Sequence, residues 1–305
     1  MTRALFITGS SGFIANYLLQ RIDLRRYRNI YCLSRTDSQI TTRLSAYDNF
    51  KFIKGSIYEV NTYRPYLASS DIVVHLAAVT GKARPEEYFN VNAKGTEFLT
   101  RQCEKLGVYK FLYISSIAVK FNDISKYYYA QSKQQGEDAV RNSNLNYTIV
   151  RPTIVIGKES PIWKGFSKLA KAPITPIFGD GTTRIQPIYI EDLINCILSI
   201  INENIFLNET HDLGGPEEIT IENFLERIHQ IYYKKDPRII HLPLRLLIFI
   251  LSVIEKRFYS VLPFTVGQLS SFLCDGTIEE NILFLRFLPQ MKNVDEMLRR
   301  IISNG

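Results

Sequence analysis

The sequence predicts an α/β protein whose core is a doubly wound parallel β-sheet. Two observations carry this prediction: short apolar runs alternate with helical patterns along the first half of the chain, and a glycine turn joins the first run to the first helix. Strands separated by helices pair as parallel neighbours, so helices are expected on both faces of the sheet.

The expected strands and helices follow one another in a regular order. Helical patterns lie at about 12–22, 86–106 and 127–143, between several of the strand-like runs. The run from Ile72 to Leu76 is apolar at four of its five positions, which is typical of a strand buried on both faces. The strand-like runs are Ala4–Thr8, Ile30–Leu33, Phe50–Ile53, Ile72–Leu76, Phe111–Ile114 and Tyr147–Val150.

Composition narrows the class of protein. The 305 residues are 46% hydrophobic and 22% charged, which is ordinary for a soluble globular protein of about two domains. The net charge of +7 suits anionic ligands such as phosphates, but no Lys/Arg block is dense enough to predict nucleic-acid binding. The four cysteines are far apart and none lies near a histidine at ligand spacing, so we expect no metal site and no disulfide. Reduced thiols and the absence of a signal-peptide pattern predict a cytoplasmic protein.

The stretch from Leu5 to Leu19 predicts a strand, a tight turn and a helix. Its glycines, Gly9 and Gly12, are followed by Ala15 in a Gly-x-x-Gly-x-x-Ala pattern. Glycine lets the backbone bend sharply and approach a ligand, and the helix start offers unpaired N–H groups and a positive dipole end to a pyrophosphate. This pattern at the start of a βαβ unit predicts a dinucleotide site in a Rossmann fold.

The end of the second strand bears on cofactor choice. In this fold an acidic residue near that point binds the ribose 2′-hydroxyl of NAD(H), whereas an Arg accepts the 2′-phosphate of NADP(H). The strand ends in Ser34 and Arg35, and no Asp or Glu stands at 33–36. NADP(H) is therefore favoured and NAD(H) stays possible; the alternative is that Arg35 is only a solvated surface residue.

A candidate catalytic group follows the fifth strand. That strand ends near Ser116, and Tyr129 and Lys133 follow at i and i+4, on one face of an expected helix. A nearby ammonium stabilises a phenolate and lowers its pKa, which makes a tyrosine usable as a general acid near neutral pH. The Tyr-x-x-x-Lys pattern also arises by chance, but here it follows the glycine turn and a serine-ended strand in the expected order.

Together these motifs resemble the extended short-chain dehydrogenases/reductases, the NAD(P)-dependent family of nucleotide-sugar epimerases, dehydratases and reductases. The resemblance spans most of the chain. The segments that carry it are Thr8–Ile14, His75–Ala78, Asn92–Thr96, Ser115–Ser116, Tyr129–Lys133, Arg151–Gly157, Gly179–Gly181, Ile190–Leu193 and Leu213–Pro216.

The resemblance implies roles for individual residues. Ser116, Tyr129 and Lys133 match the catalytic positions, and Thr80, Ser116 and Arg184 are assigned to the substrate. His75 is expected to be a structural residue at a strand end. The residues assigned to the cofactor are Gly9, Ser11, Gly12, Phe13, Ile14, Arg35, Ser56, Ile57, Leu76, Ala77, Ala78, Asn92, Tyr129, Lys133, Pro152, Thr153 and Ile154.

The resemblance also implies a domain plan. Residues 1–156 are expected to form the NADP(H)-binding Rossmann domain, and 157–305 mainly a smaller substrate-binding domain, with 176–214 returning to the first. Many members of the family form dimers through the helix that carries the tyrosine, so a homodimer is a possible assembly.

Four departures from the family pattern bear on the reaction. Only twelve residues separate Ser116 from Tyr129, which predicts a more open site, and Ser56 stands where an Asp would contact adenine. Ile117 replaces the start of the acid pair of the 4,6-dehydratases, so that activity is not expected. Arg184 stands one residue early, a variant that resembles the branch containing accessory subunits of respiratory complex I.

The favoured function is therefore an NADP(H)-dependent reductase acting on a keto group, at C4, of a nucleotide-linked sugar. One alternative is an NAD-dependent nucleotide-sugar 4-epimerase. Another is a non-catalytic NADPH-binding assembly protein, against which the intact Ser116, Tyr129 and Lys133 argue.

One apolar segment lies outside these motifs. The run from Leu242 to Ile254 is too short and too interrupted to span a bilayer. We expect a helix packed on the substrate domain or on a partner; a helix lying on a membrane surface is the less favoured alternative.

Overall fold

The computed structural model describes residues 3–262 and 264–303. Its central feature is a seven-stranded sheet in the order β11-β6-β5-β4-β1-β2-β3, in which every pair from β6 to β3 is parallel. This confirms the predicted fold class. The strands are β1 (Arg3–Thr8), β2 (Tyr27–Ser34), β3 (Phe50–Lys54), β4 (Ile72–His75), β5 (Lys110–Ile114), β6 (Asn146–Pro152) and β11 (Glu209–Leu213).

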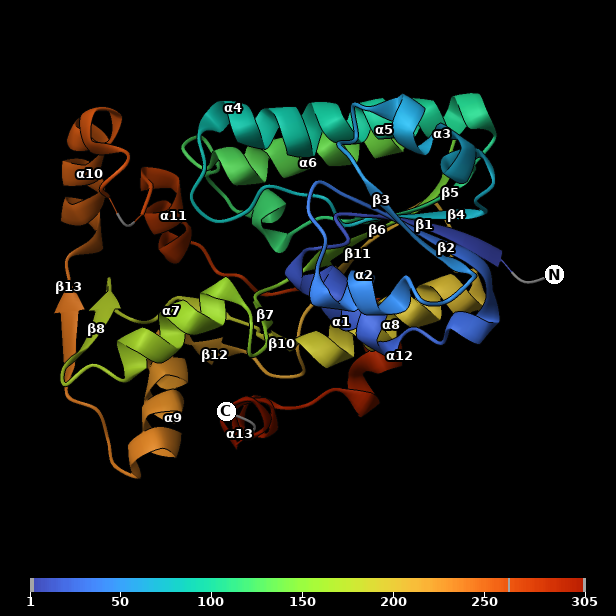
Figure 1. Ribbon diagram of the computed structural model, residues 1–305. Helices are drawn as coiled ribbons and strands as arrows, with labels where there is room; N and C mark the ends of the chain where they lie inside the picture. Colours follow the sequence, from blue (N-terminus) through green and yellow to red (C-terminus); the bar gives the residue numbers. More distant parts are fainter. Residues whose placement is uncertain (1–2, 263, 304–305) are drawn as a thin grey trace. The chain divides into compact units, whose positions relative to one another are not determined.

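Helices cover both faces of the sheet. Figure 1 shows α3, α5 and α6 on one face and α1, α2 and α8 on the other. Fully buried apolar side chains such as Phe6, Tyr63, Leu99 and Phe111 fill the space between sheet and helices. The helical segments of this part are α1 (Phe13–Arg21), η1 (Leu24–Arg26), α2 (Gln39–Leu44), α3 (Val60–Ala68), α4 (Pro85–Tyr88), η2 (Phe89–Lys94), α5 (Gly95–Leu106), α6 (Tyr128–Arg141) and α8 (Ile190–Glu203).

The chain forms two compact units. Among the described residues, the first holds those up to Ser116 together with Ser132–Arg151 and Leu193–His211. The second holds Ile117–Gln131, Pro152–Asp192 and the described residues from Asp212 onward. The functional domain boundaries expected from the sequence stay a prediction.

The second unit contains three small two-stranded sheets and most of the remaining helices. The sheets pair β7 (Val155–Ile156) with β10 (Ile188–Tyr189), β9 (Arg184–Ile185) with β12 (Ile219–Thr220), and β8 (Thr175–Phe178) with β13 (Ile239–Leu242). The helical segments are η3 (Ile117–Lys120), α7 (Pro161–Ala170), α9 (Ile221–Tyr233), α10 (Leu244–Phe258), α11 (Val266–Ser270), η4 (Ser271–Leu273), α12 (Ile282–Phe287), η5 (Leu288–Gln290) and α13 (Val294–Ser303).

The order of the strands reverses next to β1. The chain runs outward from β1 through β2 to β3, and then crosses to β4, β5 and β6 on the other side of β1. Thr8 is level with both Leu33 and His75, and His75 is level with Tyr113, so these strands end together. Ligands of doubly wound sheets bind beyond the carboxyl ends of the strands at such a reversal point.

Candidate active site

The glycine turn after β1 brings two loops into close contact. Gly9 has φ +68°, and a Cβ at this position would lie 2.6 Å from the backbone nitrogen of Ala77. The Gly9 N–H donates to the Leu33 carbonyl at 2.9 Å, and the Gly12 N–H donates to the Gly9 carbonyl at 2.9 Å. Only glycine combines this conformation with this contact, which confirms the sharp turn expected from the sequence.

The start of α1 is open to an anion. Gly12, the residue before the helix, supplies no side-chain cap, and the first N–H groups of a helix have no partner within it. The hydroxyl of Ser10 in the preceding turn is buried and without a hydrogen-bond partner in the described part of the chain. Both features offer donors at the point where the strand order reverses. Ser11, Phe13 and Ile14 are half-buried around this turn.

Hydroxyl groups gather at the carboxyl end of β2. The Oγ atoms of Ser11 and Ser34 lie 2.7 Å apart, and Thr36 donates to Ser11 Oγ at 3.2 Å. Arg35 lies exposed between Ser34 and Thr36 in sequence. This end of the strand therefore offers three hydroxyls and one guanidinium, and the nearest acidic residue in sequence is Asp37.

Asn92 fixes the loop after β4 from a turn of π-helix, η2. Its side-chain oxygen accepts from the Val79 N–H at 2.7 Å, and its amide nitrogen donates to the Val79 carbonyl at 3.0 Å and to Ser132 Oγ at 3.0 Å. The buried Asn92 thus joins that loop to α6. The loop also carries Leu76, Ala77 and Ala78, which are half-buried, and Thr80, which is exposed.

His75 is a structural residue with a fixed hydrogen-bond pattern. Thr96 Oγ1 donates to the Asn92 carbonyl at 2.7 Å, so it accepts from His75 Nε2 at 3.0 Å. His75 Nδ1 therefore accepts from the Thr8 hydroxyl at 2.6 Å. Burial lowers the pKa of His75 to about 3, which keeps the ring neutral. This arrangement agrees with the structural role expected from the sequence.

Lys133 is a buried lysine whose amino group lies at the end of β5. Its side chain is 1% exposed; Nζ donates to the Ile114 carbonyl at 2.7 Å and lies 4.2 Å from the centroid of the Tyr113 ring. Burial lowers its pKa to about 7, while the carboxylate of Glu137 acts in the opposite direction. A lysine held in this way is typical of a functional site, because a buried ammonium is costly to keep without a role.

Tyr129 lies in the first turn of α6, and Ser116 lies just after the end of β5. Tyr129 lies on α6 one helical turn before Lys133 and is half-buried. Ser116 is half-buried and follows Ser115 at the end of β5, whose N–H donates to the Val150 carbonyl at 2.7 Å. Helix geometry puts Tyr129 and Lys133 on one face of α6, as expected from their spacing.

Sequence reasoning missed a buried ion pair next to these residues. The carboxylate of Glu137 is fully buried and accepts from Arg151 Nε at 2.8 Å, from Arg151 Nη2 at 2.6 Å and from Arg141 Nη2 at 2.5 Å. These arginine partners lower the pKa of Glu137, although burial alone would raise it. The cluster fastens α6 to β6. The position of Glu137, four residues after Lys133, places it on the same helix face but does not show that it is buried.

Gly136 sets how closely α6 approaches the sheet. A Cβ at this position would collide with the Tyr113 hydroxyl and would lie 2.6 Å from the Asn92 carbonyl oxygen. One contact is at the end of a rigid ring and the other is backbone, so neither can give way easily. Glycine here allows the close packing on which the position of Lys133 depends.

We expect Gly136→Ala to destabilise the protein by about 1–3 kcal/mol, the usual cost of overpacking, despite the gain in helix propensity. Gly165→Ala on α7 is the matched control, since a Cβ at Gly165 has nothing within 4 Å. The control should be neutral or stabilising by up to about 1 kcal/mol. Denaturant midpoints of the two variants decide; equal midpoints would show that the close approach is not required.

Other predicted site residues lie in loops and at strand ends. Ser56 and Ile57 follow β3, and the Ser56 N–H donates to the Glu59 carboxylate at 2.7 Å. Thr153 is buried and its N–H donates to the Leu213 carbonyl at 2.9 Å. Pro152 ends β6, and Ile154 is half-buried.

Arg184 is occupied by acidic partners. Its guanidinium pairs with Asp275 at 3.1 Å and with Glu218 at 3.2 Å, all within the second unit. A ligand diphosphate would have to compete with both carboxylates for this side chain. The structure therefore does not present Arg184 as a ready anion contact.

These features agree with the comparison with known families. Residues 5–213 match the model of the NAD dependent epimerase/dehydratase family, more than half of the chain. The chain therefore belongs to this family, which confirms the family expected from the sequence motifs.

Curated relatives have several different names. The chain is 24% identical over 255 residues to NADH dehydrogenase (ubiquinone) 1 alpha subcomplex subunit 9 of Arabidopsis thaliana, covering 78% of this chain and 60% of the relative. It is 28% identical over 188 residues to a ceramide reductase of Caulobacter vibrioides, covering 61% and 57%. It is 25% identical over 250 residues to a UDP-glucose 4-epimerase of Vibrio cholerae, covering 72% and 74%. The chain spans about three-fifths of the length of the first curated relatives it matches.

Solved structures share the fold. A dTDP-4-dehydrorhamnose reductase from Bacillus anthracis str. Ames, in complex with NADP, matches over the full length of both chains with a TM-score of 0.70 and 18% identity. At this identity the likeness shows the fold alone.

Proposed function

We propose that this chain is an NADP(H)-dependent oxidoreductase that reduces a keto group, at C4, on a nucleotide-linked sugar. The observation that carries the proposal is Lys133, a buried lysine at the carboxyl end of β5 and one helical turn after Tyr129. The family description and the relatives named as a reductase and a 4-epimerase support hydride chemistry on a carbonyl.

The residues at the sheet edge fit a nicotinamide dinucleotide. The close approach of Gly9 to Ala77, the uncapped start of α1 and the unpartnered Ser10 hydroxyl together suit a pyrophosphate. When bound, the cofactor would supply the hydride. The hydroxyls of Ser11, Ser34 and Thr36 beside Arg35 suit an additional phosphate at the adenosine ribose.

The chain's own residues would handle the proton and the carbonyl oxygen. Tyr129 would donate its phenolic proton to the substrate oxygen as the carbonyl is reduced, and Ser116 would donate a hydrogen bond to the same oxygen. Lys133 would stabilise the phenolate that remains on Tyr129. Asn92 would hold the loop after β4 against α6, and Glu137 would hold β6 against the same helix.

Arg35→Ala should weaken NADP(H) binding by roughly 1.5–3 kcal/mol, because it removes charge-assisted hydrogen bonds to the 2′-phosphate. NAD(H) affinity should hardly change. The measurement is a titration of nucleotide fluorescence, with Arg43→Ala, exposed on the neighbouring α2, as control. Equal losses for the two cofactors, or tighter NAD(H) binding by the unmodified protein, would refute this assignment.

The proposal that the substrate carries a nucleotide is supported by the relatives and not by Arg184, because its guanidinium is paired with two carboxylates. A thermal-shift screen of nucleotide sugars with NADP(H) or NAD(H) tests it, since a ligand that binds only the folded state raises the melting temperature. Keto sugars that raise the melting temperature and consume NADPH would support the proposal.

Turnover of the cofactor separates the alternatives. A 4-epimerase would convert its substrate with no net consumption of NAD(H). A protein with only a structural role in an assembly, as the name of the Arabidopsis thaliana relative suggests, would bind NADPH and never oxidise it. Net oxidation of NADPH with a keto substrate excludes both.

A further inference from the structure

The helix α10 in the second unit is apolar on both of its sides. Its inner side includes Leu244, which is 3% exposed, and Ile248, which is half-buried. Its outer side carries Leu246, Phe249 and, one turn further, Val253, which are exposed. A helix that is apolar on every side is normally buried on every side. The outer side of α10 is apolar but exposed, which is typical of a surface that binds a partner or a membrane.

The outer residues form one continuous stripe. Leu246, Phe249, Ile250 and Val253 stand at positions i, i+3, i+4 and i+7, the spacing of one helix face. Phe249 is 66% and Val253 68% exposed. Beyond the helix, Val261 is also exposed. The helix found here confirms the expected helix in this segment, but only its inner side is packed.

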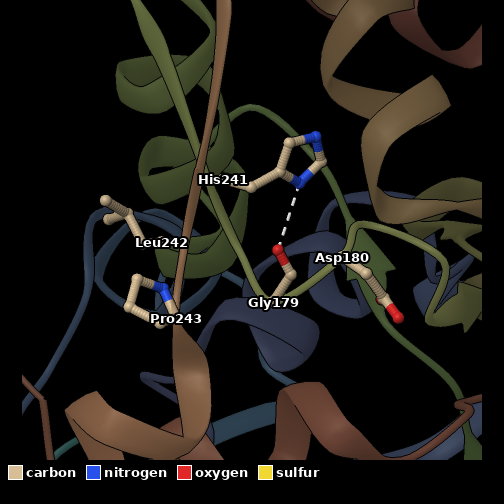
Figure 2. Close-up of a pocket in the computed structure, with 5 residues that line it drawn as sticks. All are labelled: Gly179, Asp180, His241, Leu242 and Pro243. Atoms are coloured by element: carbon tan, nitrogen blue, oxygen red, sulfur yellow. Dashed lines mark hydrogen bonds between the residues drawn. The ribbon is translucent and has the colours of Figure 1, made fainter.

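The start of α10 is held firmly in its unit. It follows β13, which pairs in parallel with β8 and places Leu242 level with Phe178. His241 and Gly179 are joined by a hydrogen bond of 3.1 Å beside a hollow of about 520 Å³ lined also by Asp180, Leu242 and Pro243 (Figure 2). The exposed stripe therefore begins at a fixed point in the fold.

The charged residues described on the exposed side of α10 itself have one sign. Arg245 lies at its start and Arg257, at i+11 from Leu246, lies at its end; both are exposed. The single acidic residue of the helix is Glu255, whose carboxylate accepts from the Val266 N–H at 3.2 Å on the side facing α11. Among the described residues of α10, the exposed side therefore carries apolar groups framed by arginines and no carboxylate.

We propose that this side of α10 binds the surface of an acidic lipid membrane, with its apolar stripe among the acyl chains and Arg245 and Arg257 at the phosphate headgroups. Interfacial helices combine these two features, and long arginine side chains reach the headgroups while their stems remain in the apolar layer. A second copy of this chain fits the surface poorly, because a self-complementary contact would bring arginines together with no carboxylate on that side to match them.

In the described part of the chain, no helix is both long and apolar enough to cross a bilayer. The expected mode is therefore attachment in the plane of the membrane surface. It does not depend on the proposed catalytic activity.

Sedimentation of the full chain with vesicles tests the proposal. The protein should bind phosphatidylserine/phosphatidylcholine vesicles and bind pure phosphatidylcholine vesicles much more weakly. The double variant Phe249→Ser with Val253→Ser should lose most of the binding with an unchanged melting temperature. Arg245→Gln with Arg257→Gln should reduce binding to the acidic vesicles roughly 30-fold, since each of the two basic residues contributes about 1 kcal/mol near such a surface.

Two controls make the result specific. Leu207→Ser with Ile282→Ser removes exposed apolar side chains elsewhere and should leave vesicle binding intact. Ile248→Asp places a charge on the inner side and should lower the melting temperature instead. Absence of binding to acidic vesicles, or equal binding by the Phe249/Val253 variant, would overturn the proposal. So would a dimer in analytical ultracentrifugation that this variant abolishes, because the stripe would then be a contact between copies.

Discussion

Tyr129→Phe should lower the turnover rate on the order of 10²–10⁴-fold, because a positioned general acid is lost while the aromatic ring and its packing remain. NADPH affinity should stay within a few-fold, since the phenol is directed at the substrate. The measurement is steady-state oxidation of NADPH with a keto substrate verified by product analysis.

Tyr128→Phe is the matched control for this change. Tyr128 is the preceding residue on α6 and is exposed, so loss of its hydroxyl should leave the rate unchanged. If Tyr129→Phe turned over the substrate at the unmodified rate, Tyr129 would not be the acid and the enzymatic proposal would lose its main support.

Lys133→Met should damage both turnover and cofactor binding, which distinguishes it from Tyr129→Phe. In the proposed site the ammonium acts on Tyr129 and also on the cofactor, a second role that the family resemblance implies. Lys105→Met, an exposed lysine on α5, is the control for loss of one positive charge. Full NADPH affinity in Lys133→Met would show that the lysine does not contact the cofactor.

The same variant should change how stability depends on pH. Burial lowers the pKa of Lys133 from its usual 10.5 to about 7 in the folded protein. Between these two values the unfolded chain binds the proton more readily, so the contribution of Lys133 to the free energy of unfolding rises with pH from about 7 to 10.5. In Lys133→Met this slope should disappear, and the variant's relative stability should be greatest near neutral pH. Denaturant unfolding at several pH values measures it; parallel curves for the two proteins would contradict it.

Much of the sheet could be predicted from local sequence patterns. The first six strands are apolar enough to stand out, and Gly9 marks a turn that only glycine allows. By contrast, β11 runs through Glu209 and Asp212, so its local pattern is not that of a buried strand. It joins the sheet through pairing with β6, a neighbour far away in the chain.

The spacing of the candidate catalytic residues could be predicted from the sequence, but the buried ion pair that holds their helix in place could not. Tyr129 and Lys133 are four residues apart, so helix periodicity alone puts them on one face. Glu137 and Arg151 are fourteen residues apart on different elements, and a polar residue in a helix gives no sign that it is fully buried. The exposed side of α10 was likewise hidden, because periodicity cannot tell an uncovered apolar helix face from a covered one.

The buried ion pair of Glu137 and Arg151 bears on which active-site residues a related protein would lose first if it no longer catalysed a reaction. Removing Arg151 would take two hydrogen bonds and one cation from the buried Glu137 carboxylate. Breaking a buried ion pair costs about 3–5 kcal/mol, a large part of the stability of an ordinary domain. Exchanging Lys133 for an apolar residue removes a buried cation and carries no such penalty. A lineage that abandoned catalysis would therefore shed the lysine early and keep the glutamate and its arginine long afterwards. A relative that keeps the Glu137–Arg151 pair but lacks the lysine would therefore be expected to share this fold without the catalytic activity.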